Sequence, residues 1–222
     1  MKEKIEQRLK LRNGQIGKVF PTILYSELLS LDLSAKNNLL TQEVVSDTAQ
    51  FDQTINAMLA GKFGIGGFLE HHSVYQRSSM YTGEEFRSIH LGVDVWAPAY
   101  TAVHIPWPGK IHSFRDNEGF GDYGPTIILE HQIEELSFFT LYGHLSRESL
   151  ENIYVGHTVN KEQKIGELGP YPENGDWPPH LHFQVMTDLL GNKGDFPGVI
   201  APSETDFYQT ICIDPMLLLT FR

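Results

Sequence analysis

The sequence predicts a mainly β protein: an antiparallel β-sheet domain with an N-terminal helical extension and a short C-terminal helix. From about Arg87 onward, short apolar runs alternate with glycine and proline, which is typical of antiparallel strands. The clear helical periodicities lie before that point. Near the C-terminus, Asp214 precedes Pro215, so a capping residue is followed by proline at a first helical position.

Two helices are expected in the N-terminal region. The first ten residues place Ile5 and Leu9 on one face of a helix. A stronger pattern runs from about Asp47 to Ala60, where Asp47 or the serine before it can cap the helix and a glycine follows its end. Its apolar positions have helical spacing and predict a packing face: Phe51, Ile55, Met58 and Leu59.

Three further segments indicate turns and loops. The glycine-rich residues 63–67 predict a tight turn or flexible loop. Residues 132–135 predict the tip of a hairpin between strands 126–131 and 137–143. The segment 187–210 is rich in glycine, aspartate, proline and serine, and we expect an ordered loop that frames a groove.

Composition limits the classes of function. The chain has 222 residues, of which 41% are apolar, enough for one substantial core. Its 17 basic and 28 acidic residues give a net charge of −11, which argues against nucleic-acid binding. Cys212 is the only cysteine, so the sequence excludes an internal disulfide and a thiolate-rich zinc cage.

The N-terminal residues bear on location. The first ten are largely charged, and no apolar stretch of signal-peptide length follows them. No stretch is long enough to span a membrane. For a complete chain this predicts a cytoplasmic protein, with the cell envelope as the alternative; the sequence does not indicate an oligomeric state.

Three short stretches hold the residue types that a zinc site needs. They are His90-Leu91-Gly92-Val93-Asp94, Tyr142-Gly143-His144-Leu145-Ser146 and Pro179-His180-Leu181-His182-Phe183. A catalytic zinc takes three protein ligands, here from imidazoles and carboxylates, and keeps one position open. The set predicts one zinc site with two spare imidazoles, and hence a metal-dependent hydrolase.

Spacing constrains how these residues meet. On an extended strand, the Cα atoms of His90 and Asp94 would lie about 13 Å apart, so the chain must fold back between them. Gly92 permits an unusual backbone conformation at that point. His180 and His182 form an i, i+2 pair, which points to one side of a strand.

The run 137–142 alternates with period two, so His144 is expected at a strand end on the rim of a sheet. Tyr142 is expected on the opposite face, in the core. Spacing alone does not assign ligands among the candidate residues. The other six histidines receive no catalytic role: His71, His72, His104, His112, His131 and His157.

The ordered set His-x-x-x-Asp, Tyr-Gly-His-Leu-Ser and Pro-His-Leu-His-Phe resembles the lysostaphin-type zinc metalloendopeptidases, whose catalytic module is the LytM domain. The resemblance covers about residues 88–186. It implies that residues 87–222 form a LytM-like zinc peptidase domain and that residues 1–86 form an extension packing on or near the active-site groove. It further implies that one zinc ion is bound by His90, Asp94 and His182.

The resemblance also implies a reaction. His144 and His180 stand unligated beside the metal and transfer protons, while a zinc-bound water, with its pKa lowered toward ~7, attacks a peptide bond. Which histidine acts as the general base stays open. The expected substrate is a peptide or peptidoglycan fragment, such as a peptidoglycan-type, glycine-rich or D-amino-acid peptide.

Three alternatives stay open. In the first, the chain is a catalytically inactive binding or regulatory module. In the second, it is a cytoplasmic zinc amidohydrolase that acts on a small metabolite. In the third, the N-terminal ~85 residues inhibit the enzyme by covering the groove or by supplying a fourth ligand in place of water. The candidates for that ligand are Asn37, Asn38 and Glu70.

Overall fold

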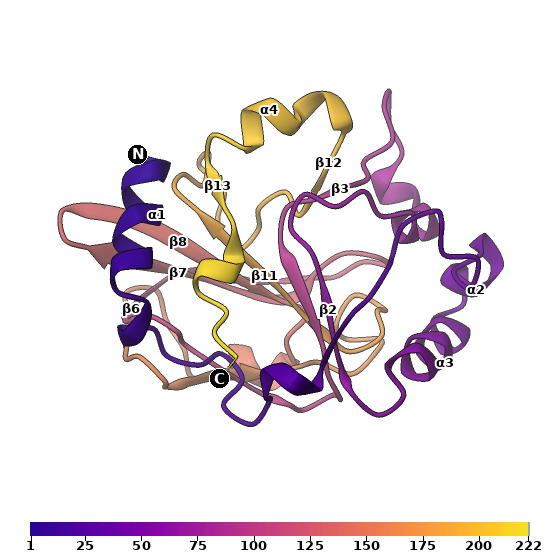
Figure 1. The fold of residues 1–222 in the computed structure, drawn as a ribbon, viewed down its shortest axis with the longest axis horizontal. Helices are drawn as coiled ribbons and strands as arrows, with labels where there is room; N and C mark the ends of the chain where they lie inside the picture. The colour runs from indigo at the N-terminus through magenta and orange to yellow at the C-terminus, as the bar shows by residue number, and fades with distance from the viewer. Residues whose placement is uncertain (222) are drawn as a thin grey trace.

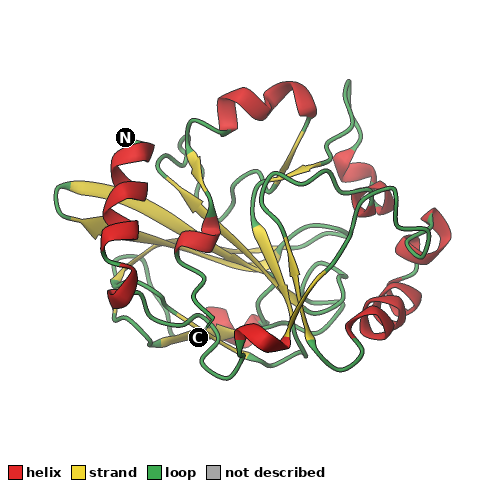
Figure 2. Ribbon diagram, viewed as in Figure 1, coloured by secondary structure: helices red, strands yellow, loops and turns green. Residues whose placement is uncertain are grey.

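The computed structural model describes residues 1–221. One long sheet crosses the molecule. It has nine strands in the order β1-β2-β4-β11-β8-β7-β6-β9, with β13 paired to β11. Their bounds are Leu28–Ser30 for β1, Phe63–Gly66 for β2, Val93–Trp96 for β4, Gly109–Asn117 for β6, Gly124–Ile133 for β7, Leu136–Gly143 for β8, Thr158–Val159 for β9, His180–Met186 for β11 and Cys212–Ile213 for β13. Figures 1 and 2 show the strands crossing the centre and the helices at the periphery. The predicted mainly β class is confirmed.

The pairing is antiparallel throughout this sheet except between β1 and β2. Two small sheets accompany it. One pairs β5 with β10, and the other pairs β3 with β12. Their bounds are Ala102–His104 for β5, Lys164–Glu167 for β10, Ile89–His90 for β3 and Val199–Ile200 for β12.

The first helix, α1 (Lys2–Leu11), packs on the sheet. Ile5 and Leu9 are fully buried in the same apolar cluster as Leu129 of β7 and Phe183 of β11. Arg8 adds an ion pair, with Nε 2.8 Å from the carboxylate of Glu134 at the end of β7. In Figure 1, α1 lies across the ends of β6, β7 and β8. The predicted N-terminal helix is confirmed, and the domain division at residue 87 stays a prediction.

The second predicted helix is α3 (Thr48–Leu59), which follows the short α2 (Gln42–Ser46). Asp47 caps it, because its carboxylate accepts a hydrogen bond from the Gln50 amide at 3.0 Å. The predicted apolar face is buried at three of its four positions, and Met58 packs at its edge.

Residues 63–66 form strand β2, so the predicted turn or loop is wrong. Glycines are uncommon in strands, but a Cβ on Gly64 would lie 2.7 Å from Cδ1 of Leu31 and 2.8 Å from Cδ2 of Leu59. The glycine lets two apolar side chains pack directly on the strand. This close approach is invisible to local sequence patterns.

The β7–β8 hairpin is present, but both strands run further than predicted. Its tip is the pair Glu134–Glu135 rather than residues 132–135, and Glu134 adopts a left-handed φ of 54°. The extra pairs, such as Gln132 with Ser137, lengthen the ladder despite their polarity.

The segment 187–210 is more regular than the predicted loop. It contains β12, the 3₁₀ turn η6 (Pro202–Glu204) and helix α4 (Thr205–Tyr208). Glu204 starts this helical stretch by accepting a hydrogen bond from the Ala201 amide at 3.0 Å. The closing helix is the 3₁₀ turn η7 (Pro215–Leu217), where the Asp214 carboxylate accepts from the Met216 amide at 2.9 Å.

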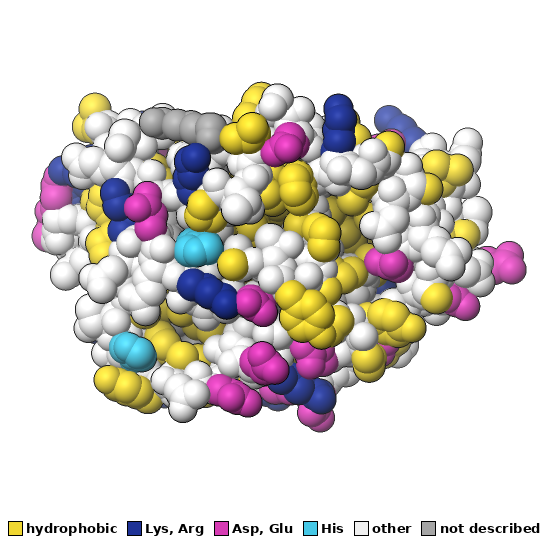
Figure 3. All heavy atoms as spheres, turned by 90° about the horizontal axis from the view of Figure 1, so that it is seen from below, with side chains coloured by type: hydrophobic (Ala, Val, Ile, Leu, Met, Phe, Trp, Pro, Cys, Tyr) yellow, Lys and Arg dark blue, Asp and Glu magenta, His cyan; other side chains and the backbone are white. Residues whose placement is uncertain are grey.

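The remaining 3₁₀ turns lie in connections. They are η1 (Asn13–Gln15), η2 (Tyr25–Glu27), η3 (Val74–Arg77), η4 (Ser79–Tyr81) and η5 (Arg147–Leu150). Figure 3 shows acidic and basic side chains interspersed on one face of the molecule. Within residues 1–221, no helix has the length and apolarity needed to cross a membrane.

The packing of α1 generates a stability prediction. Leu9→Ala removes a fully buried side chain and should lower the free energy of unfolding by about 2–5 kcal/mol. Leu11→Ala, on the same helix but 77% exposed, should change it by less than about 0.5 kcal/mol. Urea denaturation measures both, and equal effects would contradict the packing of α1 on the sheet.

Candidate active site

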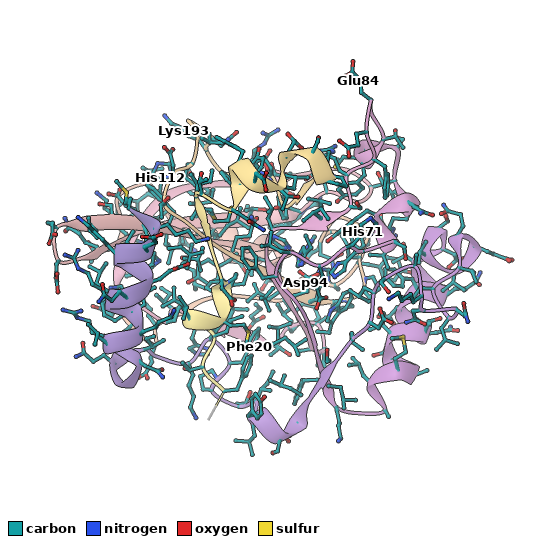
Figure 4. The ribbon with its side chains drawn as sticks, turned by 45° about the horizontal axis from the view of Figure 1, so that its top comes forward. Phe20, His71, Glu84, Asp94, His112 and Lys193 are labelled. Carbon is teal, nitrogen blue, oxygen red and sulfur yellow. The ribbon has the colours of Figure 1, made fainter. Side chains whose placement is uncertain are left out.

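His90, Asp94 and His182 converge in the interior. Nε2 of His90 lies 3.0 Å from Nδ1 of His182. Oδ1 of Asp94 lies 3.1 Å from that nitrogen and 3.2 Å from Nε2 of His90. All three side chains are buried. Figure 4 labels Asp94 near the middle of the molecule, far from Glu84 and Lys193 at its periphery.

Strand pairing brings these residues together. Asp94 of β4 is the register partner of His182 of β11. His90 ends β3, which pairs with β12, and two residues connect it to β4. The chain therefore turns between His90 and Asp94, as their spacing required.

Gly92 has a different role from the predicted one. It is not among the glycines with positive φ, so it does not supply a left-handed conformation. A Cβ there would lie 2.7 Å from Cε1 of His182 and 2.9 Å from the carbonyl oxygen of Phe183. The turn needs glycine for space against β11.

Hydrogen-bond partners assign the tautomers of the two imidazoles. Nδ1 of His90 donates to the carbonyl oxygen of Gly67 at 3.0 Å, which leaves a lone pair on Nε2. Nε2 of His182 donates to Oε1 of Gln184 at 2.9 Å, which leaves a lone pair on Nδ1. The Gln184 amide donates in turn to the carbonyl oxygen of Pro197 at 3.1 Å, which fixes its orientation.

Three atoms with free lone pairs thus lie about one hydrogen-bond length apart: Nε2 of His90, Nδ1 of His182 and Oδ1 of Asp94. The N–H group of each imidazole is on the outer side and is already hydrogen-bonded. Such a cluster needs a proton or a cation between its atoms, and two imidazoles with one carboxylate suit zinc. Burial by itself would raise the pKa of the Asp94 carboxyl, but His90 and His182 hold that pKa well below its usual range. The donor set therefore fits a zinc ion.

His180 and His144 lie next to this cluster. His180 shares the face of β11 with His182, and its Nε2 lies 4.0 Å from Oδ1 of Asp94. His144 follows the last residue of β8, as predicted, and its ring centroid is 4.3 Å from that of His180. The structure thus brings all five predicted residues into one place, although their individual roles stay predictions.

The two imidazoles are held by carbonyl groups. Nδ1 of His180 donates to Pro178 at 2.7 Å, and Nδ1 of His144 donates to Asn174 at 2.8 Å. His144 has a left-handed φ of 59°, a costly conformation for a non-glycine residue. Burial lowers the pKa of His180 to about 4 and that of His144 well below its ordinary value. Both rings are therefore neutral near pH 7, with Nε2 as an acceptor.

A cavity of about 240 Å³ opens on the site, and Asp94, His144, His180 and His182 all line it. Tyr123 also lines it, and its hydroxyl lies 3.0 Å from both Oε1 of Gln184 and the carbonyl oxygen of Phe196. The predicted core residue Tyr142 is buried against Phe183, with ring centroids 5.2 Å apart.

His72 is a neighbour of the site that sequence reasoning missed. Its ring stacks on that of His90 at 4.9 Å, and His72, His90 and Asp94 each offer a ligand atom within 4.8 Å of the others. Glu70 bonds Nε2 of His72 at 3.1 Å. His72 lies outside the three recognisable motifs, so no spacing signal could have identified it.

The proposed fourth-ligand candidates lie elsewhere among the described residues. The Glu70 carboxylate accepts from the Gly67 amide and contacts Nε2 of His72, and only the Glu70 backbone carbonyl bonds to His90, whose amide donates to it at 3.0 Å. Asn37 donates to the carbonyl oxygen of Asp32 at 2.7 Å, and Asn38 is exposed. None of the three lines the cavity.

Comparison with known proteins adds a family match. Residues 88–194 match the model of peptidase family M23. Lysostaphin from Staphylococcus simulans is 29% identical, over 59% of this chain and 43% of that protein, with a TM-score of 0.40. Its catalytic domain is 26% identical, over 68% of this chain and 98% of the domain, with the same TM-score of 0.40.

A zinc-containing peptidase from Vibrio cholerae is 26% identical, over 54% of this chain and 31% of that protein, with a TM-score of 0.37. The chain thus spans less than half the length of this peptidase and of intact lysostaphin. No curated protein matches the chain.

The space around Gly92 generates a prediction. Gly92→Ala should lower the free energy of unfolding by about 1–3 kcal/mol, because the added methyl meets His182 and the backbone of β11. Gly14→Ala is the control, because a Cβ there has nothing within 4 Å. Chemical denaturation compares them, and a Gly92→Ala protein as stable as the control would contradict the tight turn.

Proposed function

From the premise that residues 88–194 form a peptidase family M23 domain, we propose that this protein is a zinc-dependent peptidase. In this proposal His90, Asp94 and His182 hold the ion. One observation carries it: three buried donor atoms converge within 3.2 Å, and the tautomers of both imidazoles leave lone pairs between them. The proposed substrate is a peptide or a peptidoglycan fragment, cleaved at a peptide bond.

A bound zinc ion would lower the pKa of a water molecule and polarise the scissile carbonyl. The side chains of the protein supply the groups that transfer protons. His144 and His180 are neutral, so Nε2 of either one can accept a proton from the attacking water, and the protonated ring can return it to the departing amine. The carbonyl oxygens of Asn174 and Pro178 hold these rings by their Nδ1 hydrogens, so both Nε2 atoms keep the acceptor form.

Substitution of three of the five residues separates zinc binding from catalysis. His182→Ala should lose both zinc and activity, whereas His144→Ala and His180→Ala should keep about one zinc per chain and lose about 10²–10⁴ in kcat. Elemental analysis measures the metal, and peptide hydrolysis measures the rate.

Three outcomes would contradict the proposal. A metal-free protein that still hydrolyses peptides would exclude the mechanism. A wild-type protein that takes up no zinc would favour the inactive binding module instead. Zinc-loaded protein that cleaves small amides but no peptide would favour the amidohydrolase.

The partner of His182 generates a second prediction. Gln184→Leu removes the acceptor of the Nε2 hydrogen, so zinc affinity should fall about 10–100-fold. Gln184→Glu keeps an acceptor oxygen and should bind zinc nearly as tightly as the wild type. Competition with a chelator measures both dissociation constants, and equal values for the two variants would contradict the tautomer assignment.

A further inference from the structure

The cavity beside the proposed catalytic site has an apolar wall, and the M23 segment supplies only part of it. Its aliphatic and aromatic members from outside residues 88–194 include Leu33, Val74, Tyr75, Tyr81, Phe196 and Val199. The first four belong to the N-terminal region, and the last two follow the matched segment. The cavity is therefore shaped by parts of this chain beyond the family domain.

The wall is continuous with the imidazoles. The Tyr75 ring lies 4.9 Å from that of Tyr81 and 6.1 Å from that of Trp177. The Trp177 ring lies 6.0 Å from both His144 and His180. A side chain bound against this wall would thus lie next to the groups that act on the peptide bond.

Polar contacts hold the wall in place. The Tyr81 hydroxyl donates to the carbonyl oxygen of Gly121 at 2.6 Å. The buried guanidinium of Arg77 lies 4.5 Å from the ring centres of both Phe120 and Trp177, and donates to the carbonyl oxygen of Asp176 at 2.8 Å. These contacts tie the N-terminal segment to two loops of the M23 domain, so the cavity exists before any ligand binds.

The charged side chains that line the cavity beyond Asp94 have both signs. They are Arg87, Asp122 and Asp195. The cavity therefore has no lining of a single charge sign that would select a substrate side chain of the opposite charge. The aromatic and aliphatic side chains are the part of the lining that favours an apolar side chain over glycine.

We propose that this cavity is a side-chain pocket, and that the substrate carries a leucine- or phenylalanine-sized apolar side chain next to the scissile bond. The proposal rests on the proposed peptidase function. A glycine at that position would leave the wall without a partner, whereas a bulky side chain would bury its apolar surface there. Glycine-only peptides are therefore poor substrates.

The test is a series of acetylated hexapeptides in which one residue of a glycine chain is Gly, Ala, Leu or Phe. Mass spectrometry locates the cleaved bond, and kcat/KM should be at least roughly tenfold higher for Leu or Phe than for Gly. Equal rates, or a preference for hexaglycine, would overturn the pocket and leave the peptidase proposal standing.

Two variants provide a matched pair. Val74 and Val45 are equally buried, at 2% exposure, in the same apolar cluster, but only Val74 lines the cavity. Val74→Ala enlarges the pocket and should raise the Phe-to-Leu ratio of kcat/KM roughly threefold or more. Val45→Ala should leave that ratio unchanged; the same shift in both variants would contradict the proposal.

Binding without turnover separates the two proposals. Trp96 and Trp177 line the cavity, so their fluorescence should report its occupation. N-acetylphenylalaninamide should bind at least roughly tenfold more tightly than N-acetylglycinamide. Val74→Ala should change this ratio of dissociation constants, and Val45→Ala should leave it as in the wild type. Selective binding without hydrolysis of any peptide would support the pocket and contradict the peptidase proposal, whereas equal affinities would overturn the pocket.

Discussion

The antiparallel pairing of β4 with β11 is the constraint on which the candidate site depends. It sets Asp94 opposite His182 and leaves His180 on the same face of β11. A shift of this register by one residue would turn each of these side chains to the other face of the sheet. The pairing of β11 with β8 on its other edge brings Gly143 beside His182 and so delivers His144 to the same place. These two pairings therefore position four of the five predicted residues.

A second layer of hydrogen bonds sets the tautomers of the four imidazoles. Gly67, Gln184, Asn174 and Pro178 each accept the outer hydrogen of one imidazole. The inner nitrogens consequently keep their lone pairs, either for an ion or for a proton. Gly67 lies in the segment before the M23 match, so the N-terminal region contributes to the electronic state of His90 as well as to packing.

The N-terminal region also belongs to the sheet and to the walls of the cavity. Strand β2 pairs with β4 beside Asp94, η3 carries Tyr75, whose ring lies 6.4 Å from that of His90, and η4 carries Tyr81, which lines the cavity. In Figure 4, the segment that carries His71 passes beside Asp94. The M23 segment holds the five candidate residues, and residues before and after it line the cavity in front of them. The walls of the cavity therefore include residues that no motif identifies.

The sequence by itself determined the mainly β class, helices α1 and α3, the β7–β8 hairpin and the five residues that meet at the site. Caps, periodicity and ligand spacing depend on neighbours within a few residues, so they can be read along the chain. Only the tertiary structure decided that β2 is a strand, that Gly92 is needed for space, that His72 stacks on His90 and that an apolar wall faces the imidazoles. Each of these depends on groups that are distant in sequence, such as Gly92 and His182, and their close approach has no local signature.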